Sequence, residues 1–279
     1  MASGADFTDK NLTGKEMKAA GLSFACRYLS AHPGGWKELS LAEAKEKTAA
    51  GILIVSNWED TGHPANTVAA GESDAKRALA EATKCGMPTF RPIYFSIDWN
   101  TPVDGYDNYF KGVCNVLGVE RSGCYGSSGL IAHLHGKGLI KWGWRTMSWA
   151  WHGGASTAFS QVVQTGGSTV AGTAIDKDTS LTADIGGWLV GHSYAPPTTV
   201  PVPGTKPGYT HDLHLVNPQH YDVQALRWQQ QMKLHHKSRI TVDGFYGPYS
   251  VAVCKAFQKL MGLKVDGIVG ANTWAASFK

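Results

Sequence analysis

The feature that most constrains the fold is a repeated unit in which a helix-like stretch ends in glycine and an apolar stretch follows. The unit recurs along the first half of the chain, with its glycines at Gly21, Gly51, Gly86, Gly118 and Gly138. Glycine is favoured just past the end of a helix because it adopts the left-handed conformation without a Cβ clash. Helix, glycine and strand in series predict a parallel β/α architecture.

The apolar stretches number eight, near residues 4–7, 23–29, 52–58, 92–97, 123–125, 145–151, 161–164 and 173–175. This many units in so short a chain predict an α/β fold, a (β/α)8 TIM-like barrel. An open, doubly wound sheet is the alternative. A dinucleotide-binding version of that sheet has little support, because no G-x-G-x-x-G motif opens the first helix.

The composition changes at residues 195–207, where proline, threonine and glycine dominate. Such a segment predicts a semi-extended spacer. We therefore place the barrel at residues 1–194, a proline-rich linker at 195–212 and a small domain at 213–279. Residues 212–279 carry 8 of the 26 basic residues but 4 of the 22 acidic ones. A basic module indicates an anionic partner, and charge alone fits nucleic acid or an anionic cell wall equally.

The small domain contains an internal repeat. Val242-Asp-Gly-Phe-Tyr-Gly247 recurs as Val265-Asp-Gly-Ile-Val-Gly270, and apolar residues at helical spacing lie between the two copies. Helices separated by tight Asp-Gly turns predict an all-α domain. The turns lack the alternating oxygen ligands of a calcium loop, and five dispersed cysteines without C-x-x-C spacing argue against zinc or a disulfide framework.

Polar residues stand at the predicted strand ends, where a barrel of this kind has its active site. They are Asp6, Arg27, Glu59, Asp98, Tyr125, Trp151, Gln164 and Asp176. Half of them are carboxylates, and glycoside hydrolysis needs one protonated and one ionised carboxyl. We expect Glu59 to be the general acid and Asp98 its ionised partner, with Asp6 as a third catalytic carboxylate. The remaining five are predicted to bind substrate.

Several motifs in this order resemble one family. They are Gly4-Ala-Asp-Phe7, Phe24-Ala-Cys-Arg-Tyr-Leu29, Trp58-Glu59, Pro92-Ile-Tyr-Phe-Ser-Ile-Asp98, Gly123-Cys-Tyr-Gly126, Gln164 and Ala174-Ile-Asp176. The chain over about residues 3–190 resembles the glycoside-hydrolase-like domain of actinobacterial secreted proteins and phage lysins. The resemblance implies a TIM-type barrel related to the family 25 muramidases, with Asp6, Glu59, Asp98 and Asp176 lining its pocket.

One position departs from the muramidases that this family resembles. Their fourth strand ends in Asp-x-Glu, and the Glu donates the proton. Here the sequence is Asp98-Trp99-Asn100, and an asparagine amide cannot donate that proton. Either Glu59 takes the role, or the barrel binds glycan without cleaving it.

The C-terminal residues from about 220 to 279 resemble the type 1 peptidoglycan-binding domain. The motifs are Leu226-Arg-Trp-Gln229, Val242-Asp-Gly-Phe-Tyr-Gly-Pro248, Ala256-Phe-Gln258, Val265-Asp-Gly-Ile-Val-Gly270 and Thr273-Trp274. We expect Tyr246 and Trp274 to bind the cell wall.

A barrel followed by such a module resembles a phage endolysin. We therefore expect a lysozyme-like glycosidase that cleaves the glycan strand of bacterial peptidoglycan, with a non-catalytic glycan-binding protein as the alternative and a wall amidase or peptidase as a weaker one. The expected protein is a monomer that uses no metal or cofactor and binds neither nucleic acid nor membrane. The first residues, Met1 to Asp6, do not resemble a signal peptide. This predicts synthesis in the host cytoplasm and action at the cell wall.

Overall fold

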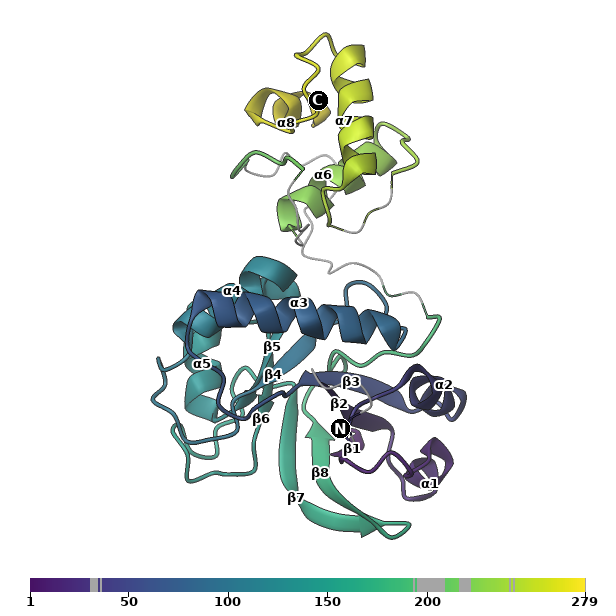
Figure 1. The fold of residues 1–279 in the computed structure, drawn as a ribbon, viewed down its shortest axis with the longest axis vertical. Helices are drawn as coiled ribbons and strands as arrows, with labels where there is room; N and C mark the ends of the chain where they lie inside the picture. The colour runs from purple at the N-terminus through teal and green to yellow at the C-terminus, as the bar shows by residue number, and fades with distance from the viewer. Residues whose placement is uncertain are drawn as a thin grey trace. The chain divides into compact units, whose positions relative to one another are not determined.

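The computed structural model describes residues 1–30, 35, 37–192, 194, 209–215, 222–240, 242 and 244–278. The chain forms two compact units, Met1–Tyr194 and Ala195–Lys279, and each is described by itself (Figure 1).

Eight strands in the first unit close into a barrel in chain order, which confirms the predicted architecture. Their bounds are β1 Ser3–Asp6, β2 Phe24–Leu29, β3 Leu53–Trp58, β4 Ile93–Ser96, β5 Ser122–Gly126, β6 Trp142–Arg145, β7 Val162–Val170 and β8 Thr173–Ser180. Consecutive strands from β1 to β7 pair in parallel. Strand β8 is antiparallel to both β7 and β1 and closes the barrel.

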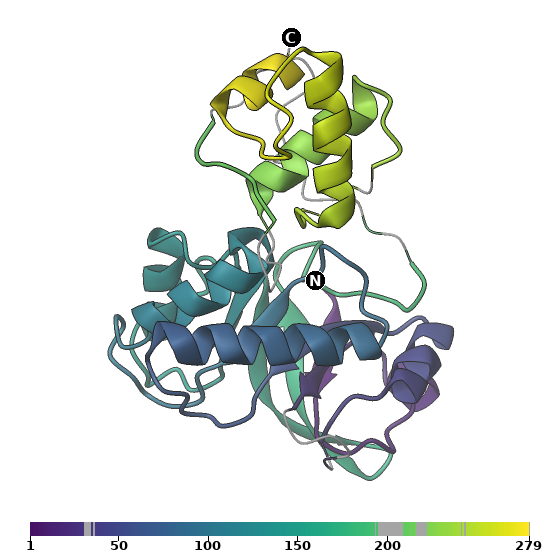
Figure 2. The same cartoon turned by 45° about the horizontal axis from the view of Figure 1, so that its top comes forward.

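Helices follow each of the first five strands and cover the outside of the barrel (Figure 2). They are α1 Gly14–Ala19, α2 Leu41–Ala49, α3 Val68–Lys84, α4 Asp107–Leu117, with a short 3-10 turn at Val119–Arg121, and α5 Ser128–Gly136. All five glycines of the repeated unit have positive φ, between 68° and 83°. The glycine signal therefore identifies the helix ends correctly.

Helices α3 and α4 lie side by side because two glycines meet at their crossing (Figures 1 and 2). A Cβ at Gly71 would lie 1.9 Å from the Tyr109 carbonyl oxygen, and one at Gly112 would lie 2.1 Å from that of Val68. Any larger side chain at either position would force the two helices apart. The pair thus fixes how α3 and α4 cover strands β3 to β5.

The last third of the barrel departs from the helix-after-strand pattern. Strand β6 ends at Arg145, where the sixth strand was predicted to begin, and residues 146–161 form a loop. Met147 and Trp149 in this loop are 43% and 70% exposed, so its apolar residues do not form a buried strand. Strands β7 and β8 are joined by Ala171-Gly172, both with positive φ, which is the geometry of a tight hairpin.

The second unit consists of α6 Val223–Leu234, α7 Pro248–Leu260 and α8 Ala271–Ser277. Its sequence repeat is also a structural repeat. Gly244 and Gly267 of the two Asp-Gly turns both have a φ of 77°. Each turn is held by a buried glutamine from the preceding helix, Gln229 for the first and Gln258 for the second.

The two glutamines make equivalent hydrogen bonds. Each side-chain oxygen accepts from the turn glycine N–H, at 2.8 Å for Gln229 and 2.9 Å for Gln258. Each amide nitrogen donates to the carbonyl of the residue that follows the turn glycine. It also donates to a hydroxyl in the following helix, that of Ser250 or Thr273. The Asp-Gly motif therefore recurs because each turn needs a left-handed glycine and a glutamine to bind its backbone.

Candidate active site

The four predicted carboxylates lie at the same end of the barrel. Asp6 ends β1, Glu59 directly follows β3 and Asp98 lies two residues after β4, so parallel pairing brings these three to the C-terminal edge. Strand β8 runs the opposite way, yet its register pairs Asp176 with Asp6. Asp98 interacts electrostatically with Glu59 and Asp176, and Asp6 interacts with Asp176. The sequence prediction that these residues lie together fits this arrangement.

Asp6 is the buried centre of a hydrogen-bond network. The Tyr28 hydroxyl donates to its Oδ1 at 2.9 Å, and the Gln164 amide donates to its Oδ2 at 2.9 Å. The same amide nitrogen lies 3.4 Å from Oδ2 of Asp176. The Tyr125 hydroxyl lies 3.1 Å from Gln164 Oε1, which fixes the orientation of the amide. Gln164 thus connects two carboxylates from β1 and β8 with Tyr125 from β5.

Burial perturbs two of the carboxyls. It raises the pKa of Asp6 to about 7, although the hydrogen bonds from Gln164 and Tyr28 oppose the shift. Partial burial, reinforced by the charge of Glu59, also raises the pKa of Asp98. A carboxyl with a raised pKa retains its proton closer to neutral pH and can act as a general acid.

Glu59 has a different environment. The Lys37 ammonium lies 2.7 Å from its Oε1, and both side chains are about one fifth exposed, 21% and 22%. Lys37 also lies over the Tyr28 ring at 5.0 Å from its centroid. Sequence analysis missed Lys37, because it lies outside every predicted strand and belongs to no motif. Lys37 and Glu59 are 22 positions apart in the sequence, so only the tertiary fold brings the two side chains together.

Asn100, the position that departs from the muramidases, anchors the loop after β6. Its Oδ1 accepts hydrogen bonds from the His152 backbone N–H at 3.2 Å and lies 2.8 Å from Nδ1 of the same histidine. The His152 carbonyl in turn accepts from the Gly129 N–H at 2.8 Å, and the Ser128 hydroxyl donates to the Gly154 carbonyl at 2.9 Å. The loop that carries Trp149 and Trp151 is therefore held to the ends of β4 and β5.

The aromatic residues fall into two groups. Tyr125 is 7% exposed and packs edge-on against Trp144, with 4.6 Å between ring centroids. Trp58 is buried as well, with the Arg77 guanidinium 5.3 Å from its ring centroid. Trp149 is 70% exposed, and Trp151 in the same loop is half-buried. The loop after β6 therefore supplies exposed aromatic surface, and Trp99 beside Asp98 adds a further ring that is 36% exposed.

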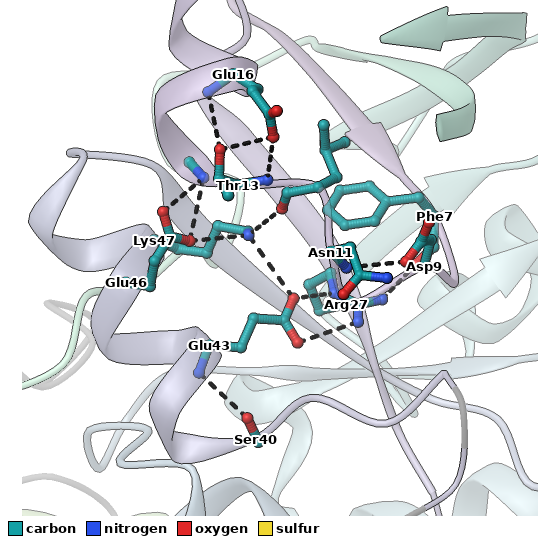
Figure 3. Close-up of polar contacts among 12 residues, drawn as sticks. Phe7, Asp9, Asn11, Thr13, Glu16, Arg27, Ser40, Glu43, Glu46 and Lys47 are labelled. Carbon is teal, nitrogen blue, oxygen red and sulfur yellow. Dashed lines mark hydrogen bonds and ion pairs between the residues drawn. The ribbon is translucent and has the colours of Figure 1, made fainter. Parts of the chain in front are cut away.

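The substrate-binding role predicted for Arg27 is wrong, because the residue is fully buried and faces the outer helices (Figure 3). Its Nε lies 2.6 Å from Glu43 Oε1, a second nitrogen lies 3.2 Å from Glu43 Oε2, and a third donates to the Phe7 carbonyl. Neighbouring residues of a strand face opposite sides. Since Tyr28 faces Asp6 inside the barrel, Arg27 faces outward, where Glu43 and Lys47 of α2 form a buried ionic cluster.

The wall-binding role predicted for Tyr246 and Trp274 is contradicted too. Tyr246 is 4% exposed and donates to the Gly267 carbonyl at 2.9 Å, and Trp274 is fully buried. Both belong to the core of the second unit. Large aromatic side chains supply much of the apolar area of a small core, and both rings serve that purpose here.

No group of three or more potential metal ligands is placed to hold an ion among the residues that the structure describes. Within the same residues, no helix combines the length and hydrophobicity needed to cross a membrane.

Comparison with known proteins identifies both units. Residues 15–183 match the family described as "Rv2525c-like, glycoside hydrolase-like domain". Residues 222–276 match the family described as "Putative peptidoglycan binding domain".

The similar proteins include one from Mycobacterium tuberculosis. The chain is 29% identical over 198 residues to its "Putative peptidoglycan hydrolase Rv2525c", covering 66% of this chain and 82% of that protein. The crystal structure of the Tat-secreted Rv2525c with L-tartrate is 26% identical with a TM-score of 0.62, covering 67% of this chain and 98% of that one. A second crystal form, with HEPES, is 28% identical with the same TM-score and coverage.

Proposed function

The chain belongs to the Rv2525c-like, glycoside hydrolase-like family, and on this premise we propose that its barrel hydrolyses the glycan strand of bacterial peptidoglycan. The observation that carries the proposal is the group of carboxylates at the C-terminal end of the barrel. Asp98 has a raised pKa, while Glu59 is bound by a lysine. Hydrolysis of a glycosidic bond needs one carboxyl that holds a proton and one that is ionised. The two environments supply this difference.

The surroundings of the two residues favour the reverse of the roles expected from sequence. The Lys37 ammonium forms an ion pair with the Glu59 carboxylate. Partial burial and the Glu59 charge favour the protonated form of Asp98, since both raise its pKa. In our proposal Asp98 donates its proton to the leaving glycosidic oxygen. Glu59 then activates water or stabilises the oxocarbenium-like transition state.

The other residues at this end of the barrel bind and orient the sugar. Asp6 and Asp176 share the Gln164 amide, so their carboxylates are held in place before substrate binds. The Tyr125 hydroxyl binds the oxygen of the same amide. Trp151, in the loop anchored by Asn100, offers a ring against which a sugar can stack.

The match of the second unit to a peptidoglycan-binding family supports peptidoglycan as the partner. A wall-binding module raises the local concentration of the barrel at its substrate without changing the chemistry. Since Tyr246 and Trp274 are buried, the contacts with the wall fall to other residues of this unit. The uneven charge of the chain, with the basic excess in residues 212–279, suits an anionic wall.

A non-catalytic glycan-binding protein is the second candidate, and one observation favours it. Asn100 occupies the position of the muramidase acid, and its side chain binds His152. The barrel would then recognise glycan through the same carboxylates and aromatic residues without cleaving it.

The finer assignment to a phage endolysin rests on the pairing of the two domains. The relative from Mycobacterium tuberculosis is Tat-secreted, which is a different route out of the cytoplasm. Expression inside a bacterial host with and without a membrane-permeabilising partner separates the two routes. Lysis that depends on the partner supports the endolysin assignment, and export of the protein by itself opposes it.

The experiment that tests the enzyme proposal is release of reducing sugar from purified peptidoglycan by the wild type, Asp98→Asn and Glu59→Gln. Asp104→Asn is the matched control, because Asp104 is an exposed carboxylate on the segment before α4. Release by the wild type and the control, with loss of about 100-fold or more in the two site variants, supports a glycosidase centred on these residues. No release from the wild type, with the protein still sedimenting with the wall, supports the binding protein.

A further inference from the structure

A carboxyl that no sequence motif identified lies below the proposed active site. Asp178 is on β8, two residues beyond Asp176, so both side chains belong to the same face of the strand. The register of the antiparallel pair aligns Gly4 with Asp178 and Asp6 with Asp176. Asp178 is therefore the diagonal neighbour of Asp6, one step deeper in the barrel. It is 1% exposed.

The partners of Asp178 leave one of its oxygens unsatisfied. The Trp144 indole N–H donates to Oδ1 at 2.8 Å. Oδ2 is buried and accepts no hydrogen bond from the nitrogen and oxygen donors of the described residues. The described part of the chain also provides no ion pair for this carboxyl. What faces it are the Asp6 carboxyl and the thiol of Cys26, which is a weak donor.

A charge in this position is costly. An ionised carboxyl buried without a cation loses its hydration, and the usual outcome is that the group keeps its proton. Two adjacent buried carboxyls cannot both be ionised without strong repulsion. A proton on Oδ2 removes both problems, because it converts an acceptor without a donor into a donor toward Asp6. Burial, followed by the charge of Asp6, accordingly raises the pKa of Asp178 well above its usual range.

We propose that Asp178 is a positioning residue that keeps a proton and donates it in a hydrogen bond to Asp6, so that the pair carries at most one negative charge. Asp6 would then receive three hydrogen bonds, from Asp178, Tyr28 and Gln164, and would hold the Gln164 amide under the substrate. The titratable groups that face the pair are Cys26 and Tyr28 of β2, Tyr125 of β5 and Asp176 of β8.

The inference makes a prediction about stability that does not need the enzyme to be active. A group whose pKa is raised by folding holds an extra proton in the folded state above its unfolded pKa. Its contribution to stability is therefore complete below that unfolded value and is lost as the pH rises through the folded pKa. For Asp6 the loss extends from the ordinary aspartate pKa of 3.8 to about 7, and the raised pKa of Asp178 extends the loss to higher pH. Each extra proton changes the unfolding equilibrium constant about tenfold per pH unit.

The test compares the wild type with Asp178→Asn and Asp178→Leu by chemical unfolding between pH 5 and 7. Asparagine keeps a donor for Asp6 but cannot titrate, whereas leucine removes both properties. We expect the unfolding equilibrium constant of Asp178→Asn to rise less steeply with pH than that of the wild type, by a factor of about ten per pH unit. The control, Asp104→Asn, should keep the wild-type slope. An Asp178→Asn slope equal to that of the wild type overturns the proposal.

The activity arm rests on the proposed function. There, Asp178→Asn should retain sugar release within a few-fold and shift its pH profile, while Asp178→Leu should lose activity even where it is folded. If Asp178→Leu is folded and keeps the wild-type pH profile, the positioning role is refuted. If Asp178→Leu does not fold, the slope of Asp178→Asn decides. A flattened slope together with no sugar release by the wild type refutes the enzyme and leaves the proton assignment standing.

Discussion

Replacing Glu43 with glutamine should destabilise the barrel strongly although the residue lies outside the active site. The substitution removes the anion that binds Arg27, a fully buried residue. The same carboxylate lies 4.0 Å from the ammonium of Lys47, whose side chain is 1% exposed. Lys47 retains Glu46 at 3.0 Å, but Arg27 retains no carboxylate among the described residues (Figure 3). Removing one partner of a buried ion pair typically costs about 3–5 kcal/mol, because the remaining charge stays buried and uncompensated.

The magnitude converts into a large change in melting temperature. For a domain of this size, 1 kcal/mol corresponds to a shift of about 2–4 °C, so the melting temperature of the barrel should fall by about 6–20 °C. Calorimetry or thermal circular dichroism measures this change. The double variant Arg27→Met with Glu43→Leu is the matched control, because it removes both charges. We expect it to lie within about 1–2 kcal/mol of the wild type, since apolar replacements of buried pairs are often neutral.

Two results would refute this reasoning. A loss below about 1 kcal/mol in Glu43→Gln would show that Arg27 finds another partner or is hydrated. A stable, folded double variant that no longer releases sugar would mean that Arg27 serves the active site after all. Activity measured below the melting temperature of each variant separates the two effects.

Three further outcomes are expected. Lys37→Met should raise the pKa of Asp98 further, because the substitution removes a cation that lowers this pKa. The alkaline limb of the pH–rate profile should then move to higher pH, and an unshifted limb contradicts the prediction. Gln258→Leu leaves the buried N–H of Gly267 without a hydrogen-bond acceptor, which destabilises the second unit by about 1–3 kcal/mol for each buried group left unpaired. Sedimentation with the wall should therefore fail, while hydrolysis of soluble fragments by the barrel persists. Trp149→Ala should raise KM several-fold without changing the melting temperature, and an unchanged KM removes the ring from the binding surface.

The sequence predicted the fold where local signals determine it. A glycine at a helix end has a conformation that few other residues adopt, so the five β/α units could be counted before their tertiary contacts were known. The direction of β8 could not be read in this way. It depends on a two-residue hairpin at Ala171-Gly172, and no helix signal between β7 and β8 marks the reversal.

The candidate site was predictable to the level of strand ends but not of side-chain direction. Asp6, Glu59 and Asp98 follow from the rule that parallel strands end together. Arg27 failed because the same rule ignores which face of β2 a residue occupies. Asp178 was missed because the predicted eighth strand stopped at residue 175, before the Asp-x-Asp alternation that places Asp178 below Asp176.

Buried aromatic residues limited the prediction for the second unit. The Asp-Gly repeat identified the turns, but the number of rings that a small domain needs for its own core is a tertiary property. Tyr246 packs against Trp228 with 5.7 Å between ring centroids, and Trp274 packs against Phe278 at 4.8 Å. The repeat therefore identifies the module without locating its binding surface.

Asn100→Glu distinguishes the two functional candidates most directly. If Asp98 is the acid, a second carboxyl at position 100 adds no essential group and removes the anchor of His152, so sugar release should stay constant or fall. If the barrel is inactive because it lacks a muramidase-like donor, the same variant should gain activity that the wild type does not have. Asn100→Ala is the control, because it removes the anchor without supplying a donor. Gain of release in Asn100→Glu alone would refute the assignment of Asp98 as the proton donor.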